Sequence, residues 1–113
     1  LDTAIGRKVA ILGDMFELGE NEKQMHYDVG MYLGTKNIDV LITAGALAAN
    51  IAEGTRNYVN THYNAHGCEV HQFKTRDDML KCIGQILNKD DNILIKASHG
   101  MEFSKVVEAV KTI

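Results

Sequence analysis

Four short apolar runs alternate along the chain with longer segments in which apolar residues recur at helical spacing. The runs are KVAILG at 8–13, IDVLITAG at 38–45, CEVHQF at 68–73 and NILIKA at 92–97. Short apolar runs that end at glycine or at polar residues are typical of buried strands. The run at 68–73 alternates polar and apolar positions, so we expect this strand to lie nearer an edge of its sheet.

The intervening segments predict helices over 21–36, 46–59, 75–89 and 102–113. The first should have acidic residues in its first turn, where the helix dipole favours them, and an apolar face made by Met25, Val29, Tyr32 and Leu33. In the third, Thr75 is a candidate N-cap three residues before Asp78. Its apolar positions are Met79, Leu80, Ile83, Ile86 and Leu87.

This alternation of strands and helices predicts an α/β fold. Short apolar strands that are each followed by a helix favour a parallel sheet covered on both faces, with right-handed crossovers. We therefore expect a three-layer, Rossmann-like, doubly wound and mainly parallel sheet flanked by helices. The 113 residues suffice for one domain, and no proline or linker-like segment divides them.

Ligands of such sheets bind at the carboxyl ends of the strands, so the loops that follow the strands are the candidate site. Asp14, Met15, Phe16 and Glu17 follow the first strand. Lys96, Ser98, His99 and Met101 end or follow the last one. Around Thr43, after the second strand, we expect an ordinary loop in which glycine serves the turn.

Several common functional signatures are missing from the sequence. It contains no phosphate-binding P-loop, no G-x-G-x-x-G dinucleotide motif and no G-x-S-x-G nucleophile elbow. A net charge of -3 gives no electrostatic reason to expect nucleic acid. No apolar run approaches the length of a membrane helix, so we expect no membrane association.

The histidines and cysteines do not indicate a metal site or a disulfide. His62 and His66 have the spacing of two zinc ligands on one helix face, but a zinc site needs more ligands, so we expect none. His26 falls beside the apolar face of its helix, within reach of Glu22, and we expect it to be exposed or to act in capping. The two cysteines, 68 and 82, are expected to be free thiols.

Two blocks of sequence give the chain its resemblance to the C-terminal domain of the Mur ligases. The first is an apolar strand, a Gly-Asp-Met-x-Glu-Leu-Gly loop and a helix with His-x-x-Val-Gly, here Gly13, Asp14, Met15, Glu17, Leu18, Gly19, His26, Val29 and Gly30. The second is "ILIKASHGMEFSKVV", which matches the family at Lys96, Ser98, Met101, Val106 and Val107. Within the family, the pattern is most similar to members that add D-alanyl-D-alanine to a UDP-N-acetylmuramoyl tripeptide.

The resemblance implies a cytoplasmic ligase of three domains that serves peptidoglycan precursor synthesis. One domain holds the UDP-sugar peptide, and a central domain holds ATP and Mg²⁺. The third, which this chain resembles, presents the dipeptide. In this family the terminal carboxylate of the tripeptide is activated as an acyl phosphate, which the amine of D-alanyl-D-alanine then attacks. A closing domain suits this chemistry, because it brings the reactants together and excludes water.

Family members of this type also suggest roles for individual residues. Lys96 and Ser98 would face the dipeptide carboxylate or the nucleotide phosphates. Asp14 and Glu17 would shape the loop that meets the central domain, and a helix-entry anion near the following N-terminus is a nearly equal alternative for Glu17. No catalytic residue is assigned within this chain.

The chain departs from the family pattern in two residues and in its extent. Ala97 replaces a glycine, and His99 replaces an arginine, whose permanent forked cation histidine lacks. The family's domain begins earlier, with an Asp-x-Tyr-Asn-Ala-Asn-Pro loop that borders the nucleotide. We therefore expect this chain, residues 1–113, to be one domain of a longer enzyme without its first βα unit, and to be inactive alone.

A different class of function is a small regulatory or binding module of the receiver type. A receiver would need acidic residues after its first strand, an aspartate after its third and a lysine after its last. Asp14 and Lys96 partly match this requirement, but Lys74 and Thr75 follow the third strand instead of an aspartate.

Overall fold

The computed structural model describes residues 6–16 and 19–113. The elements in chain order are β1 (Lys8–Gly13), α1 (Glu22–Gly34), β2 (Val40–Ala44), α2 (Ala48–Thr61), β3 (Glu69–Phe73), α3 (Arg76–Ile86), β4 (Asn92–Lys96), the short 3-10 helix η1 (His99–Met101) and α4 (Ser104–Val110). All four expected strands are present. The last expected helix is shorter than predicted, because η1 and a break at Glu102–Phe103 precede it.

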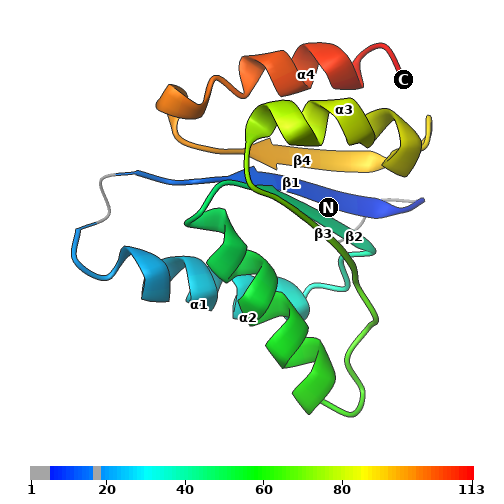
Figure 1. Cartoon of the computed structure of the whole chain (residues 1–113). Coiled ribbons are helices and arrows are strands. Elements are labelled where there is room, and N and C mark those ends of the chain that lie inside the picture. Colours follow the sequence, from blue (N-terminus) through cyan, green and yellow to red (C-terminus); the bar gives the residue numbers. More distant parts are fainter. Residues whose placement is uncertain (1–5, 17–18) are drawn as a thin grey trace.

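The four strands form one parallel sheet in the order β3-β2-β1-β4. Helices α1 and α2 cover one face, and α3 and α4 cover the other (Figure 1). This confirms the predicted three-layer α/β fold. The expected edge position of the strand at 68–73 is also confirmed, since β3 lies at one end of the sheet.

The central strand β1 is buried on both faces. Val9 and Ile11 belong to the core under α3 and α4, whereas Ala10 and Leu12 belong to the core under α1 and α2. All four are at most 5% exposed. Such a strand needs apolar residues at every position, which explains the continuous apolar run in the sequence.

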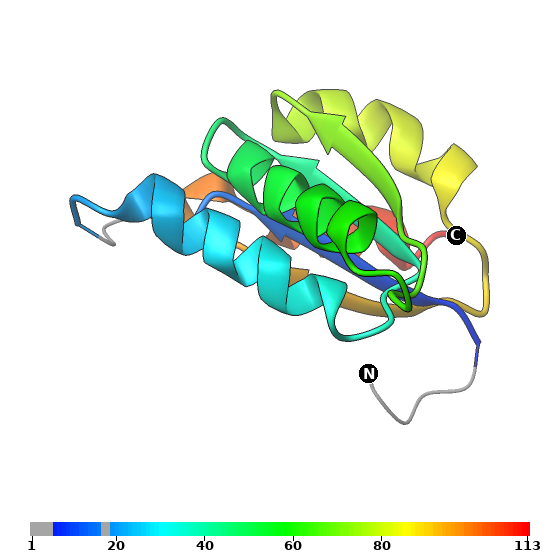
Figure 2. The ribbon, with the colours of Figure 1, turned by 90° about the horizontal axis from the view of Figure 1, so that it is seen from below.

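The predicted face of α1 is partly wrong. Met25 and Tyr32 are 42% and 60% exposed, and the buried residues of the helix are His26, Gly30 and Gly34. Helices α1 and α2 lie side by side along the sheet (Figure 2). A Cβ atom on Gly30 would lie 2.0 Å from the carbonyl oxygen of Ile51 in α2. The two helices therefore approach through small residues, which a search for an apolar stripe does not detect.

Helix α3 follows its sequence prediction closely. The Thr75 side chain accepts a hydrogen bond from the Asp78 amide at 3.0 Å, which confirms it as the N-cap. Met79, Ile83 and Leu87 are buried against the sheet. This cap fixes where the chain turns from β3 into α3, at the same edge of the sheet as the other strand ends.

Candidate functional site

The carboxyl ends of β1 and β4 lie next to each other, because the two strands pair in parallel with Leu12 opposite Lys96. The loops that follow them are therefore neighbours, although about 80 residues separate them in sequence. We call the surface formed by Asp14, Met15, Phe16, Lys96, Ser98, His99, Gly100 and Met101 the strand-end patch. Glu17, the remaining predicted site residue, lies outside the described residues.

Ser98 joins the two loops of the strand-end patch. Its amide donates a hydrogen bond to the Asp14 carbonyl oxygen at 2.9 Å. Its hydroxyl oxygen accepts a hydrogen bond from the Phe16 amide. The Phe16 ring also lies beside Gly100, 3.6 Å from where a Cβ atom on that glycine would stand. The structure thus brings the two predicted groups of site residues into one surface.

The Asp14 carboxylate is turned inward and is only 7% exposed. Its Oδ1 atom accepts a hydrogen bond at 2.7 Å from the amide of Ala48, the first residue of α2. An anion at this position is favoured by the unpaired amides and the dipole of the helix N-terminus. Gly45 has a φ of +115°, and a Cβ there would lie 2.3 Å from Asp14 Oδ1. The glycine after β2 therefore serves the turn, as expected, and also makes room for this carboxylate.

His26 is fully buried, which contradicts the expectation of an exposed or capping residue. Its Nε2 atom accepts a hydrogen bond from the Met15 amide at 3.0 Å, and its Nδ1 atom lies 2.6 Å from the Glu22 carbonyl oxygen. These partners require the neutral ring with the proton on Nδ1. The predicted proximity to Glu22 is correct, but the link to Met15 was missed because sequence spacing does not reveal contacts to a loop.

Lys96 and His99 are exposed at the end of β4 and at the start of η1. Two hollows flank His99. One, of about 300 Å³, is lined by Ala97, Ser98, His99, Glu102, Phe103 and Ser104. The other, of about 290 Å³, is lined by Phe16, Ser98, His99 and Gly100. The side of the patch that carries Ser98 and His99 is therefore concave enough to receive a small ligand.

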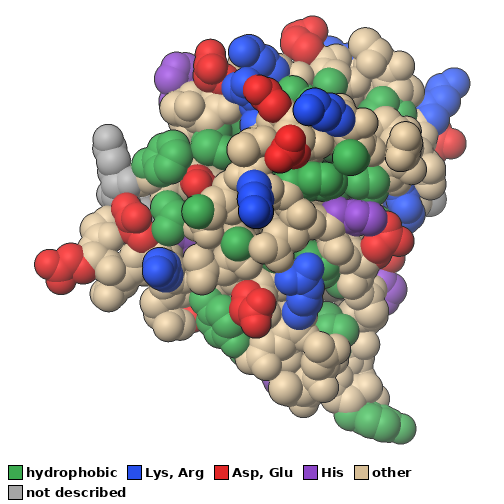
Figure 3. Space-filling view, in the orientation of Figure 1, with side chains coloured by type: hydrophobic (Ala, Val, Ile, Leu, Met, Phe, Trp, Pro, Cys, Tyr) green, Lys and Arg blue, Asp and Glu red, His purple; other side chains and the backbone are tan. Residues whose placement is uncertain are grey.

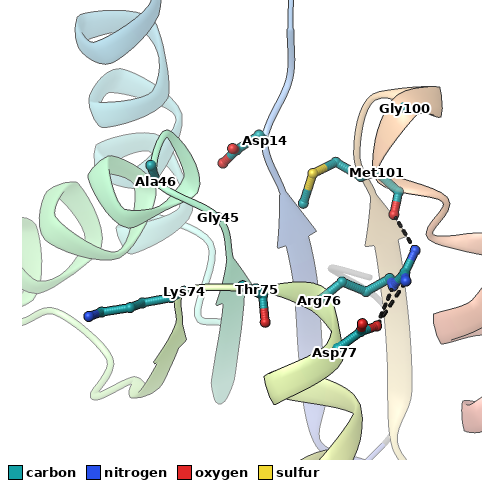
Figure 4. Close-up of a pocket in the computed structure, with 9 residues that line it drawn as sticks. All are labelled: Asp14, Gly45, Ala46, Lys74, Thr75, Arg76, Asp77, Gly100 and Met101. Atoms are coloured by element: carbon teal, nitrogen blue, oxygen red, sulfur yellow. Dashed lines mark hydrogen bonds and ion pairs between the residues drawn. The ribbon is translucent and has the colours of Figure 1, made fainter.

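A third concavity of about 310 Å³ opens beside the patch (Figure 4). It is lined by Asp14, Gly45, Ala46, Lys74, Thr75, Arg76, Asp77, Gly100 and Met101. The segment at 74–77 was not among the predicted site residues. It lies at the carboxyl end of β3, so the rule that placed the other loops at this edge would also have found it.

Arg76 connects this third strand end to η1. Its guanidinium donates to the Met101 carbonyl oxygen at 3.2 Å and to Asp77 Oδ1 at 2.8 Å, and it lies 3.4 Å from Glu102 Oε2. The hydrogen bond with Asp77 raises the pKa of Arg76 and lowers the pKa of Asp77. Figure 4 shows Arg76 extending toward Met101, whereas Lys74 points to the opposite side. The Arg76 side chain therefore links the start of α3 to η1.

The two candidate zinc ligands do not share a helix face. His62 is the C-cap of α2 and stacks on Tyr58, with ring centroids 3.7 Å apart. His66 lies in the following loop and contacts Asp39 at 2.7 Å. Within residues 6–16 and 19–113, no group of three or more His, Cys, Asp or Glu side chains could hold a metal ion. Over the same residues, no helix is long and apolar enough to cross a membrane.

Charged side chains of both signs are mixed over the face seen in Figure 3, and no extended basic patch is visible there. The two cysteines, 68 and 82, are free thiols, as expected. Burial raises the pKa of the Cys68 thiol to about 11, so this cysteine is poorly suited to act as a nucleophile.

The family model of the Mur ligase, glutamate ligase domain matches residues 1–99. The chain belongs to this family. The UDP-N-acetylmuramoyl-tripeptide–D-alanyl-D-alanine ligase of Bacillus subtilis (strain 168) is 35% identical to this Mur ligase domain over 103 residues, which are 91% of the chain and 21% of the relative. The ligase of the same name from Buchnera aphidicola is 29% identical over 110 residues, 96% of the chain and 21% of the relative.

Solved structures show the same fold. A crystal structure of MurF from Acinetobacter baumannii superimposes with a TM-score of 0.76 and 21% identity, over 97% of this Mur ligase domain and 22% of that protein. The MurF ligase of Thermotoga maritima in complex with ADP superimposes with a TM-score of 0.67 and 22% identity, over 96% of this domain and 22% of that protein. The chain thus spans about a fifth of the length of the relatives that it matches.

Proposed function

We propose that this Mur ligase domain is the substrate-presenting C-terminal domain of a ligase that adds D-alanyl-D-alanine to a UDP-N-acetylmuramoyl tripeptide. The observation that carries the proposal is the 35% identity to a curated ligase of that name over nearly the whole chain. The domain would act in the cytoplasm, where peptidoglycan precursors are made. The receiver-like alternative loses support, since the chain belongs to the Mur ligase family and the Asp14 carboxylate caps α2.

ATP and Mg²⁺ would be bound mainly by a central domain outside this chain, and they would activate the tripeptide carboxylate as an acyl phosphate. The described residues do not fit such a site themselves, since they include no metal-binding group and no P-loop. The contribution of this chain would be to hold the dipeptide so that its amine faces the activated carbon, and to exclude water.

The strand-end patch offers two groups for the dipeptide carboxylate. Lys96 is exposed, and within the described residues no acidic side chain forms an ion pair with it. The Ser98 hydroxyl accepts a hydrogen bond from the Phe16 amide, which leaves its own hydrogen for a ligand. A lysine cation and a hydroxyl donor together suit a carboxylate, because hydrogen bonds to an ionised acceptor are the stronger kind.

Chemical-shift mapping of the chain with millimolar D-alanyl-D-alanine tests this proposal. We expect weak binding, because the dipeptide is small and the other domains supply part of its surroundings. Amide shifts should concentrate at 14–16 and 96–101. Lys96→Ala should reduce the affinity, and Lys105→Ala on α4 is the matched control that should not. Shifts confined to the region around His62, with both loops silent, would refute the assignment.

A further inference from the structure

His26 is a buried polar residue that contacts the strand-end patch through the Met15 amide. It is 0% exposed and sits on α1, which covers the sheet face opposite to α3 and α4. A buried imidazole without hydrogen bonds is costly, and here both ring nitrogens have backbone partners. One partner, Glu22, is in the same helix. The other, Met15, lies two residues beyond β1, in the loop that forms the patch.

The bond to Met15 completes a set of three consecutive anchors. Asp14 accepts from the Ser98 amide, Met15 donates to His26, and Phe16 donates to the Ser98 hydroxyl. The Met15 amide has left the strand ladder, so without His26 it would lose the partner that the structure gives it. The Asp14–Phe16 segment is thus fixed from the β4 side by Ser98 and from the α1 side by His26.

We propose that His26 is a positioning residue that holds the loop after β1 in the conformation that binds the dipeptide. The inference rests on the proposed function. His26 does not touch the ligand in this assignment; it acts through the Met15 amide. Loss of that hydrogen bond removes the anchor on the α1 side, so Met15 can shift and change the position of the adjoining Phe16 ring in the hollow that it lines with Ser98 and Gly100.

The test uses amide hydrogen exchange in the chain without ligand. In His26→Phe, the Met15 amide should exchange at least about tenfold faster relative to the strand amides of Ile11 and Ile42, as the loss of one buried hydrogen bond predicts. His26→Gln should restore part of the protection, because its amide oxygen can accept from Met15. A Met15 amide without protection in the unsubstituted chain would overturn the proposal.

Thr55→Val is the control for a merely structural role. Its hydroxyl donates to the Gly30 carbonyl oxygen at 2.8 Å, so the variant weakens the contact between α1 and α2 without touching the loop. It should change the exchange of Met15 and of the strand amides together. The same Met15-specific increase in Thr55→Val as in His26→Phe would show that His26 acts only through helix packing, which contradicts the proposal.

Dipeptide titrations separate this inference from the function on which it rests. His26→Phe should weaken binding by at least about fivefold, His26→Gln by less, and Thr55→Val should leave the affinity unchanged once all three are folded. Equal affinity of His26→Phe and the unsubstituted chain would overturn the positioning role. Absence of dipeptide binding in the unsubstituted chain would instead refute the proposed function, while the exchange result would still decide whether His26 fixes the loop.

Discussion

The close approach of α1 and α2 predicts that one glycine-to-alanine substitution is harmful where another is helpful. Alanine is favoured over glycine inside a helix by about 1 kcal/mol. At Gly30 the added Cβ would lie 2.0 Å from the Ile51 carbonyl oxygen and 2.9 Å from the Thr55 amide nitrogen, so the helices must separate. Such overpacking costs about 1–3 kcal/mol.

Separation of the helices would also lengthen the hydrogen bond of 2.8 Å from the Thr55 hydroxyl to the Gly30 carbonyl oxygen. Its loss adds about 1 kcal/mol. After subtraction of the gain in helix propensity, Gly30→Ala should lower the free energy of unfolding by about 1–3 kcal/mol. At about 4 °C per kcal/mol for a domain of this size, the decrease in Tm is easily measured.

Gly84→Ala is the matched control, since Gly84 lies in α3 and a Cβ atom added there would meet nothing within 4 Å. It should raise the free energy of unfolding by about 0.5–1 kcal/mol. Urea unfolding followed by far-UV circular dichroism measures both variants. The packing argument would be refuted by a Gly30→Ala variant that is as stable as the unsubstituted chain or more stable.

Three further predictions concern acid stability, a buried hydroxyl and activity. The hydrogen bond from Arg7 lowers the pKa of Asp91, so the stability that this pair contributes is present above the ordinary carboxyl value of about 4 and is lost as pH falls through the lowered value; Asp91→Asn should therefore be destabilising at pH 7 in urea unfolding, and less so in strong acid. The Thr43 hydroxyl is buried without a hydrogen-bond partner in the part of the chain that the structure describes, so Thr43→Val should leave the urea midpoint unchanged or raise it. The chain alone should not hydrolyse ATP in a phosphate-release assay, because its sequence contains no P-loop; hydrolysis that persists through further purification would contradict this.

The strands could be predicted from the sequence, because a buried strand has to be apolar on its own. The edge position of β4 could not, since its run at 92–97 is apolar although Leu94 is 43% exposed. The run at 8–13 matches β1 residue for residue. The face of α1 could not be predicted in this way. Its closest contacts use Gly30 against α2, and the absence of a side chain leaves no apolar signal.

The proximity of the loops after β1 and β4 could be predicted, but the hydrogen bonds within the candidate site could not. Parallel strands that end at Gly13 and Lys96 must place the loops that follow them at the same edge, so the topology alone brings these loops together. The bonds that shape this edge run between residues far apart in sequence, such as His26 to Met15 and Arg76 to Met101. A side chain that bonds to a backbone amide or carbonyl leaves no trace in the identity of its partner residue, so sequence reasoning misses such bonds.

The strand-end patch contains two kinds of polar residue, and they should respond differently to substitution. Asp14 and Ser98 use their side chains to join backbone segments, so Asp14→Ala or Ser98→Ala should alter the loops and lower stability whether or not a ligand is present. Lys96 is exposed at the end of an edge strand, so Lys96→Ala should leave urea unfolding nearly unchanged and lower only the affinity for the dipeptide. A Lys96→Ala variant that loses as much stability as Ser98→Ala would show that the lysine belongs to the scaffold. This result would refute the role of Lys96 as the positive charge that binds the dipeptide carboxylate.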